Sequence, residues 1–176
     1  MTASGRAYTL YLAGFDVFRP DAVAYGESLK AMCRQHGIEG LYPLDNAGPA
    51  ELRDRALAAW IYRSNIALIQ RADGVLANLN PFRGAEPDSG TAFEVGYAVA
   101  LGKPVWAYTR QAGSIVDQVA VAKSADGTRH VDAGGYTVED FGMNLNLMLA
   151  CSATVVVGDA AACLARVARD IGGGRQ

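Results

Sequence analysis

Along the chain, short apolar runs alternate with longer stretches in which the apolar residues have helical spacing. Five apolar runs have strand length and are rich in β-branched or aromatic residues. Between them, apolar residues recur at intervals of three and four, which is typical of amphipathic helices. The expected strands lie within residues 8–14, 39–46, 73–80, 103–109 and 151–159, and the expected helices span residues 22–36, 51–71, 89–101 and 160–171.

Strands separated by helices predict a parallel sheet with helices on both faces. With 176 residues, the chain fits one domain. We therefore expect an α/β fold, a flavodoxin-like (Rossmann-like) three-layer sandwich with a five-stranded parallel sheet. Ligands of such sheets bind at the carboxyl ends of the strands. Those ends carry the sequences AGFDVF, YPLDN, NLNPFRGAEPD and AYTRQ.

Residues 109–142 do not fit the simple alternation of strands and helices. The sequences SADGT and DAGGY indicate turns, with RHV between them. A segment of this length is either a small β-hairpin excursion over the site or a mobile lid.

Charge and composition exclude several classes of function. The net charge is -2 and no basic block is longer than a pair, which argues against nucleic-acid polymers and anionic membranes as partners. No apolar stretch approaches the roughly 18 residues of a membrane span. The initial apolar run is too short and too polar for a signal peptide. These features predict a cytoplasmic protein.

The residues also lack the common patterns of metal and cofactor sites. Neither His36 nor His130 has a ligand partner at metal spacing, so we expect no metal. No G-x-G-x-x-G or P-loop motif is present, and no cofactor is expected. The cysteines, odd in number, are interpreted as buried free thiols in a reducing compartment; they are Cys33, Cys151 and Cys163.

The sequence DSGTAFEVGYA, residues 88–98, places Glu94 inside an otherwise apolar helical pattern. Asp88 and Ser89 are good helix N-caps, and Gly90 allows the chain to turn tightly into the helix. Glu94 then lies in about the second turn, where the helix dipole favours an ionised carboxylate. An ionised and aimed carboxylate can act as a nucleophile. The alternative is an exposed helix residue or one partner of an ion pair.

Four other polar residues are candidates, each with a structural alternative. Tyr11 lies in the first expected strand and is either a core residue or a site residue. Asp16 lies between two phenylalanines, which suits a flat heterocycle, or it caps a turn. Asn65 points toward the same pocket or belongs to the polar surface. Asp73 opens the central strand, where an aspartate usually satisfies nearby backbone donors.

Several segments together resemble the nucleoside 2-deoxyribosyltransferase family. They are spread over the chain up to about residue 150, and their order and spacing carry the resemblance. The segments are YLAGFDVFRPDA (11–22), YPLDN (42–46), ADGVLANLNPFRG (72–84), DSGTAFEVGYA (88–98) and LNLML (145–149).

The resemblance implies a nucleoside deoxyribosyltransferase, a pentosyltransferase acting on 2′-deoxynucleosides and free nucleobases. In the family, a glutamate at the position of Glu94 attacks C1′ of a 2′-deoxynucleoside. The base leaves, a covalent deoxyribosyl ester remains, and a second base takes the sugar in ping-pong order. The resemblance also implies a homo-oligomer with shared active sites, and the NLNPFRG and GFDVFRPDA stretches favour purines.

The resemblance further implies roles for individual residues. Tyr11 matches the tyrosine that orients the nucleophile, and Asp88 matches an aspartate that contacts the sugar. Asn146 matches an asparagine that reaches a neighbouring subunit's site and binds the 5′-hydroxyl. Asn65 departs from the family, because some members have there an aspartate proposed to protonate the leaving base. The expected substrate-binding residues are Gly14, Phe15, Asp16, Asn65, Gly90, Asn146 and Met148.

Two alternative functions stay open at this point. One is an N-glycoside hydrolase that acts on 2′-deoxynucleosides or their 5′-monophosphates, using Glu94 with water as the acceptor. The other is a non-catalytic module of the same fold that senses nucleotides. The loop GFDVFRPDA, with one arginine and bulky phenylalanines, argues for a free 5′-hydroxyl rather than a phosphate.

Overall fold

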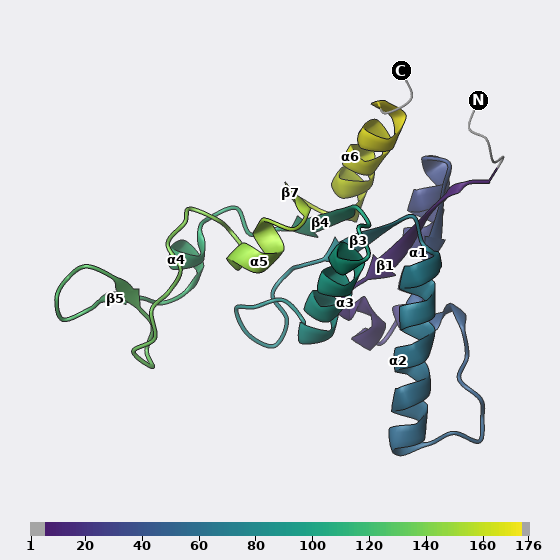
Figure 1. Ribbon diagram of the computed structural model, residues 1–176, viewed down its shortest axis with the longest axis horizontal. Coiled ribbons are helices and arrows are strands. Elements are labelled where there is room, and N and C mark those ends of the chain that lie inside the picture. Colours follow the sequence, from purple (N-terminus) through teal and green to yellow (C-terminus); the bar gives the residue numbers. More distant parts are fainter. Residues whose placement is uncertain (1–5, 174–176) are drawn as a thin grey trace.

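A computed structural model describes residues 6–173 and shows a five-stranded parallel sheet between two layers of helices (Figure 1). The strand order is β2-β1-β3-β4-β7, the flavodoxin-like order that the sequence predicts. Each pair of neighbouring strands is parallel. The strands are β1 (Tyr8–Ala13), β2 (Ile38–Leu41), β3 (Gly74–Asn78), β4 (Val105–Thr109) and β7 (Thr154–Val157).

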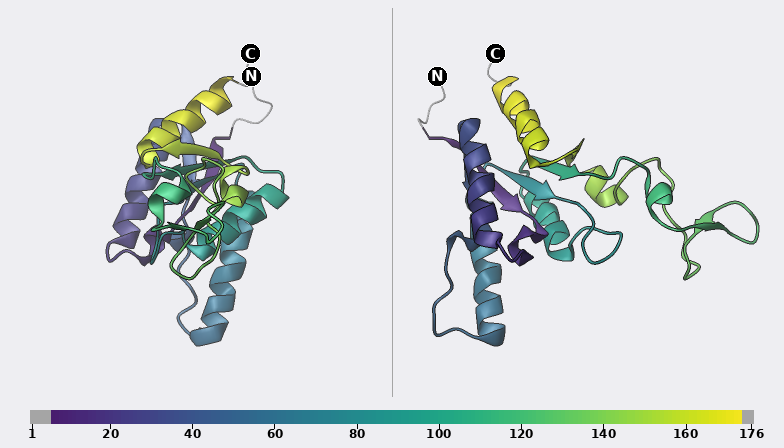
Figure 2. Two further views of the ribbon diagram at one scale, coloured as in Figure 1. Left: turned by 90° about the vertical axis from the view of Figure 1, so that its left-hand side faces the viewer. Right: turned by 180° about the vertical axis from the view of Figure 1, so that it is seen from behind.

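The helices cover both faces of this sheet, as Figure 2 shows. α1 and α6 lie on one face, and α2 and α3 lie on the other. Alternate residues of each strand enter opposite cores, so that Tyr11 packs toward α2 and α3 while Leu10 and Leu12 pack toward α1 and α6. The helices are α1 (Ala22–Gln35), α2 (Asp54–Arg71), α3 (Ser89–Ala100), α5 (Leu147–Ala150) and α6 (Ala160–Gly173).

The predicted elements all form, but several of their ends differ from the prediction. Short 3-10 turns follow β1 and β2 directly, η1 at Phe15–Phe18 and η2 at Pro43–Asp45. α2 begins at Asp54, three residues later than predicted. The last helix was predicted to end at residue 171, yet α6 continues through Gly173.

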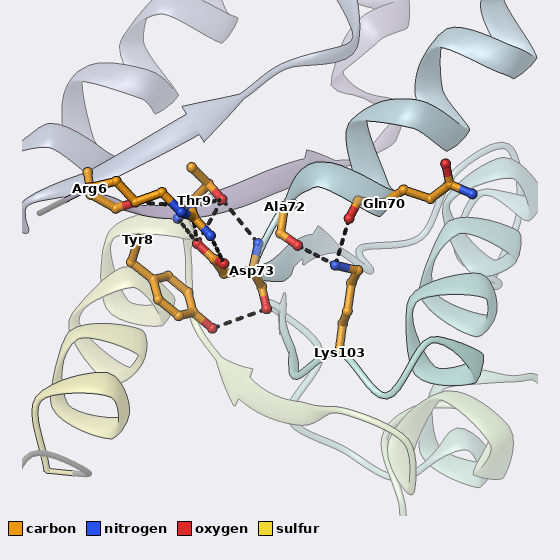
Figure 3. Close-up of polar contacts among 8 residues, drawn as sticks. Arg6, Tyr8, Thr9, Gln70, Ala72, Asp73 and Lys103 are labelled. Carbon is orange, nitrogen blue, oxygen red and sulfur yellow. Dashed lines mark hydrogen bonds and ion pairs between the residues drawn. The ribbon is translucent and has the colours of Figure 1, made fainter. Parts of the chain in front are cut away.

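Asp73 has a structural role at the junction of α2 and β3 (Figure 3). Its carboxylate accepts hydrogen bonds from the backbone N–H of Thr9 at 2.8 Å and from the Thr9 hydroxyl at 2.9 Å, and it pairs with Arg6 at 2.6 Å. Burial alone would raise the pKa of Asp73, but the bonds from Arg6 and Thr9 hold it below its usual range. The structural interpretation of this aspartate is therefore confirmed.

Residues 110–144, here called the arm, project away from the rest of the fold (Figures 1 and 2). The arm contains the short helix α4 (Ile115–Gln118) and an antiparallel pair, β5 (Ala122–Lys123) with β6 (His130–Val131). The hairpin, one of the two alternatives left open by the sequence, is present. None of its residues is fully buried, because the arm packs against little of the chain.

One prediction about the cysteines is wrong. Cys33 and Cys163 are buried free thiols, but Cys151 is exposed, since it follows the single turn of α5 at the edge of the fold.

Within residues 6–173, none of the helices combines the length and apolar character that crossing a membrane requires. The same residues contain no cluster of three or more potential His, Cys, Asp or Glu metal ligands.

Candidate active site

Three elements bring polar side chains together around Glu94. Glu94 lies on α3, and its Oε1 accepts a hydrogen bond of 2.5 Å from the hydroxyl of Tyr11 on β1. Asn65 on α2 donates its amide N–H to the same oxygen at 3.4 Å. Tyr11 and Asn65 thus both contact Glu94, although the three residues lie far apart in the chain.

The start of α3 sets the position of Glu94. Asp88 is the N-cap, and its Oδ2 accepts from the backbone N–H of Thr91 at 2.9 Å and from the Thr91 hydroxyl at 3.0 Å. A side chain at Gly90 would meet Oδ2 of Asp88 at 3.0 Å, so the glycine leaves room for the cap. The cap stabilises the first turn of α3. Thr91, fully buried, was not singled out from the sequence, although its spacing of three from an aspartate is a capping pattern.

The electrostatics of Glu94 differ from the sequence-based expectation. Burial raises the pKa of Glu94 to about 7, and the nearby charge of Asp88 acts in the same direction. The hydrogen bonds from Tyr11 and Asn65 oppose this shift. The expected benefit of the helix dipole is therefore outweighed by loss of solvent. Burial and the adjacent Glu94 also raise the pKa of Tyr11, so that its hydroxyl remains a hydrogen-bond donor at neutral pH.

The second oxygen of Glu94 differs from the first in its contacts. Within residues 6–173, Oε2 has no hydrogen-bond partner, and it is not sealed from solvent. One oxygen is thus held by two donors from neighbouring elements, while the other has no partner among the described residues. This is the arrangement that a carboxylate nucleophile requires, because the attacking atom is oriented and unoccupied.

Asn65 contributes a further feature to the site. Its Oδ1 is buried and has no hydrogen-bond partner among the described residues. An unpaired buried acceptor is costly, and a ligand N–H is one group that would satisfy it. Because an amide does not release a proton at neutral pH, Asn65 is suited to accept a hydrogen bond rather than to act as a general acid.

The loop after β1 holds Asp16 differently from the sequence-based interpretation. Asp16 is buried, and its Oδ2 accepts from Asn78 at 2.8 Å. Burial raises its pKa. Its partner Asn78 comes two residues after Leu76 on β3, so its side chain faces the same side of the sheet as Leu76, toward α1 and α6. Asp16 therefore lies on the opposite face of the sheet from Glu94. The structure does not bring Asp16 to the carboxylate of Glu94.

Phenylalanines still cover this loop. Phe15 and Phe18 both stack on Phe82, with ring centroids 4.8 Å and 5.5 Å apart. Phe82, in the loop after β3, was not singled out from the sequence. At Gly14 a side chain would meet Cβ of Asn78 at 2.9 Å, so close packing of the two loops requires glycine there. Aromatic stacking thus joins the ends of β1 and β3.

The family model for nucleoside 2-deoxyribosyltransferase matches residues 10–148. The chain belongs to the nucleoside 2-deoxyribosyltransferase family. The match includes both Tyr11 and Glu94, and it confirms the resemblance seen in the sequence.

Solved structures agree with this membership. A 2-desoxiribosyltransferase from Leishmania mexicana is 35% identical, with a TM-score of 0.72, and the match covers 92% of this chain and 97% of that chain. A 2-deoxyribosyltransferase from Bacillus psychrosaccharolyticus has the same fold, with 19% identity, a TM-score of 0.57 and coverage of 86% and 87%. A conserved protein from Enterococcus faecalis also has the fold, with 24% identity, a TM-score of 0.57 and coverage of 96% and 99%.

A curated relative is similar over a shorter range. An uncharacterized protein of Schizosaccharomyces pombe is 40% identical over 103 residues, which is 57% of this chain and 49% of that protein. The match thus spans about half the length of the yeast protein.

Two residues implied by the nucleoside 2-deoxyribosyltransferase family lie elsewhere in this chain. Asn146 is the N-cap of α5, and with Met148 it lines a groove of about 470 Å³ between α3 and α5. Ala92 and Val95 of α3 line this groove, whereas Glu94 does not. Met148 is 71% exposed. Within one chain, Asn146 and Met148 therefore do not join the cluster around Glu94.

Proposed function

We propose that the protein transfers the 2-deoxyribosyl group between nucleobases, with Glu94 as the nucleophile. The observation that carries the proposal is the oriented carboxylate, with Oε1 held by Tyr11 and Asn65 and Oε2 unoccupied. Membership in the nucleoside 2-deoxyribosyltransferase family supports the reaction class. So does the 35% identity to the 2-desoxiribosyltransferase from Leishmania mexicana.

The reaction has two displacements at C1′ of the sugar. In the first, Oε2 of Glu94 forms a bond to C1′, the bond from C1′ to the base nitrogen breaks, and the base leaves with the electron pair. In the second, a nitrogen of another base attacks C1′, the ester bond breaks, the base gives up its N–H proton to water, and Glu94 regains its charge. Each step passes through an oxocarbenium-like state, which the adjacent carboxylate stabilises. Tyr11 keeps Oε1 in place throughout.

The leaving base needs a proton, and Asn65 does not supply it. Water remains as the source, since the charged carboxylate of Asp88 is an acceptor at the start of α3 and Asp16 lies on the other face of the sheet. The buried Oδ1 of Asn65 is instead proposed to accept an N–H from the base. We also propose a preference for purines, on the resemblance of the loops after β1 and β3 to that branch of the family.

The proposed enzyme is a homo-oligomer with shared active sites. Asn146 is separated from Glu94 within one chain, so it would serve a neighbouring subunit's site. Large hydrophobic side chains are exposed on α2, α3 and α5, as expected of a surface that another subunit covers. They are Ile61, Tyr62, Phe93, Val99 and Met148. A cytoplasmic location is part of the proposal and agrees with three cysteines that form no disulfide.

A comparison of two reactions tests the proposed function. The protein is incubated with deoxyinosine and adenine, and separately with deoxyinosine alone. We expect deoxyadenosine in the first tube, because the ester on Glu94 is passed to adenine, and much slower release of free deoxyribose in the second. Chromatography of the nucleosides gives the readout. Deoxyribose released at similar rates in both tubes would identify a hydrolase instead, and no change in either would identify a sensing module.

A further inference from the structure

The arm contributes one carboxylate to the region around Asn146. Glu139 accepts at both of its oxygens, with Oε1 bonded by the amide N–H of Asn146 and Oε2 bonded by the backbone N–H of Leu147 at 3.0 Å. The other end of the Asn146 amide is also engaged, because its Oδ1 accepts from the N–H of Met148 at 3.0 Å. The amide of Asn146 is therefore fixed from two sides, and Glu139 is the contact that comes from the arm.

We propose that Glu139 determines the substrate class at the sugar's 5′ position, selecting a free 5′-hydroxyl over a 5′-phosphate. The inference rests on the proposed function, in which Asn146 contacts the 5′-hydroxyl. Glu139 acts as a positioning residue for the amide and as a negative charge beside it. This assigns a role to the arm, whose hairpin otherwise buries no side chain.

The hydrogen-bonding capacity of Asn146 explains the first part of this role. An asparagine amide has two N–H donors and one acceptor oxygen. One N–H donates to Glu139, and the oxygen accepts from the backbone N–H of Met148. One N–H of the amide therefore remains for the substrate. A neutral hydroxyl needs one such donor. Because Glu139 and Asn146 are seven residues apart and directly bonded, both reach the same site, whichever subunit that site belongs to.

Charge explains the second part. A phosphate at the sugar's 5′ position would accept a hydrogen bond from the amide of Asn146. The Glu139 carboxylate accepts from the same amide, so the two negative groups would lie close together. Like charges at such a separation repel strongly where water is excluded. Sites that bind phosphate use lysine or arginine. Among the described residues that line the groove beside Asn146, the charged side chain is Glu86, a second carboxylate.

The test compares two donors and two variants. The donors are deoxyinosine and deoxyinosine 5′-monophosphate, each with adenine as acceptor. Glu139→Gln keeps the shape of the side chain and removes its charge, and it should raise kcat/KM for the monophosphate relative to the nucleoside by about tenfold or more. Asp140→Asn is the matched control, since Asp140 is the next residue and pairs with His130 at 3.3 Å. This control should leave the ratio within about twofold of wild type.

A third donor tests the positioning role separately from folding. Glu139→Ala frees the amide of Asn146 and should raise KM for deoxyinosine more than it lowers kcat. With 2′,5′-dideoxyinosine, which has no 5′-hydroxyl, the same substitution should change KM little. A merely structural role for Glu139 would impair both donors equally, and that result would refute the positioning role.

Other outcomes separate this inference from the proposed function. Wild-type protein that forms no deoxyadenosine contradicts the proposed function. In that case, calorimetry measures the affinities of the protein for the same two donors. Glu139→Gln should raise the affinity for the monophosphate relative to the nucleoside by about tenfold or more. An unchanged ratio in Glu139→Gln, an equal rise in Asp140→Asn, or no binding of either donor would overturn the role of Glu139.

Discussion

Replacing Glu94 by glutamine is expected to lower the rate of deoxyribosyl transfer by on the order of 10⁴-fold or more, since removing a nucleophile removes the covalent route. Glutamine has nearly the same shape and still accepts a hydrogen bond from Tyr11 through its carbonyl oxygen. It cannot form the ester, because a neutral amide is a poor nucleophile. The measurement is the initial rate of deoxyadenosine formation from deoxyinosine and adenine. Hydrolysis of deoxyinosine should fall in parallel.

The control for this variant is its stability, whose expected change has a definite sign. The pKa of Glu94 is raised in the folded protein, so the ionised carboxylate destabilises the fold as pH rises from about 4.5 to about 7. Glutamine removes this cost, which is at most about 3 kcal/mol at pH 8. Glu94→Gln should therefore unfold at a temperature no lower than wild type at pH 8. Retained transfer activity in this stable variant would contradict the role of Glu94.

The rate of donor cleavage is expected to rise with pH through about 7. The raised pKa of Glu94 means that half of the free protein carries a protonated, inactive carboxyl at that pH. Below it, log kcat/KM should fall with a slope of one, because one proton blocks the nucleophile. The measurement is the pH profile of kcat/KM for deoxyinosine, and an acid limb centred near pH 4.5 would count against the burial of Glu94.

Two variants should move this limb in opposite directions. Tyr11→Phe removes a hydrogen bond that lowers the pKa of Glu94, so the limb should move up by about one pH unit. Asp88→Asn removes a charge that raises the pKa, so the limb should move down, while asparagine still caps α3. Shifts in the same direction would show that another group controls the profile.

The sequence predicted most of the fold because its signals are local. Alternating strands and helices predicted the parallel sheet and its order, and the first helix, predicted to end at residue 36, ends at Gln35. The element ends were less predictable, since they depend on tertiary contacts. Leu52 continued the helical pattern of α2 but lies outside that helix. Cys151 has an apolar local sequence, yet the short helix before it leaves the thiol exposed.

Site residues could be predicted where the local sequence marks them. Properties that depend on contacts between residues far apart in the chain were less predictable. Glu94 stood out as a carboxylate in an apolar helix, but its raised pKa depends on burial by the fold. Asp16 had a suggestive aromatic context, yet Asn78 holds it on the far face of the sheet. Glu139 belongs to no recognisable sequence motif, and its proposed role can be seen only from its hydrogen bonds to Asn146 and Leu147 in the folded protein.

The most direct test is intact-mass analysis of protein quenched with acid during turnover of a 2-fluorinated deoxynucleoside, whose ester is hydrolysed slowly. We predict that the protein gains the mass of one fluorinated deoxypentosyl group, and that peptide mapping places it on Glu94. Glu94→Gln should gain nothing under the same conditions. Full turnover of the donor with no added mass on the wild-type protein, or the added mass on another residue, would contradict the account.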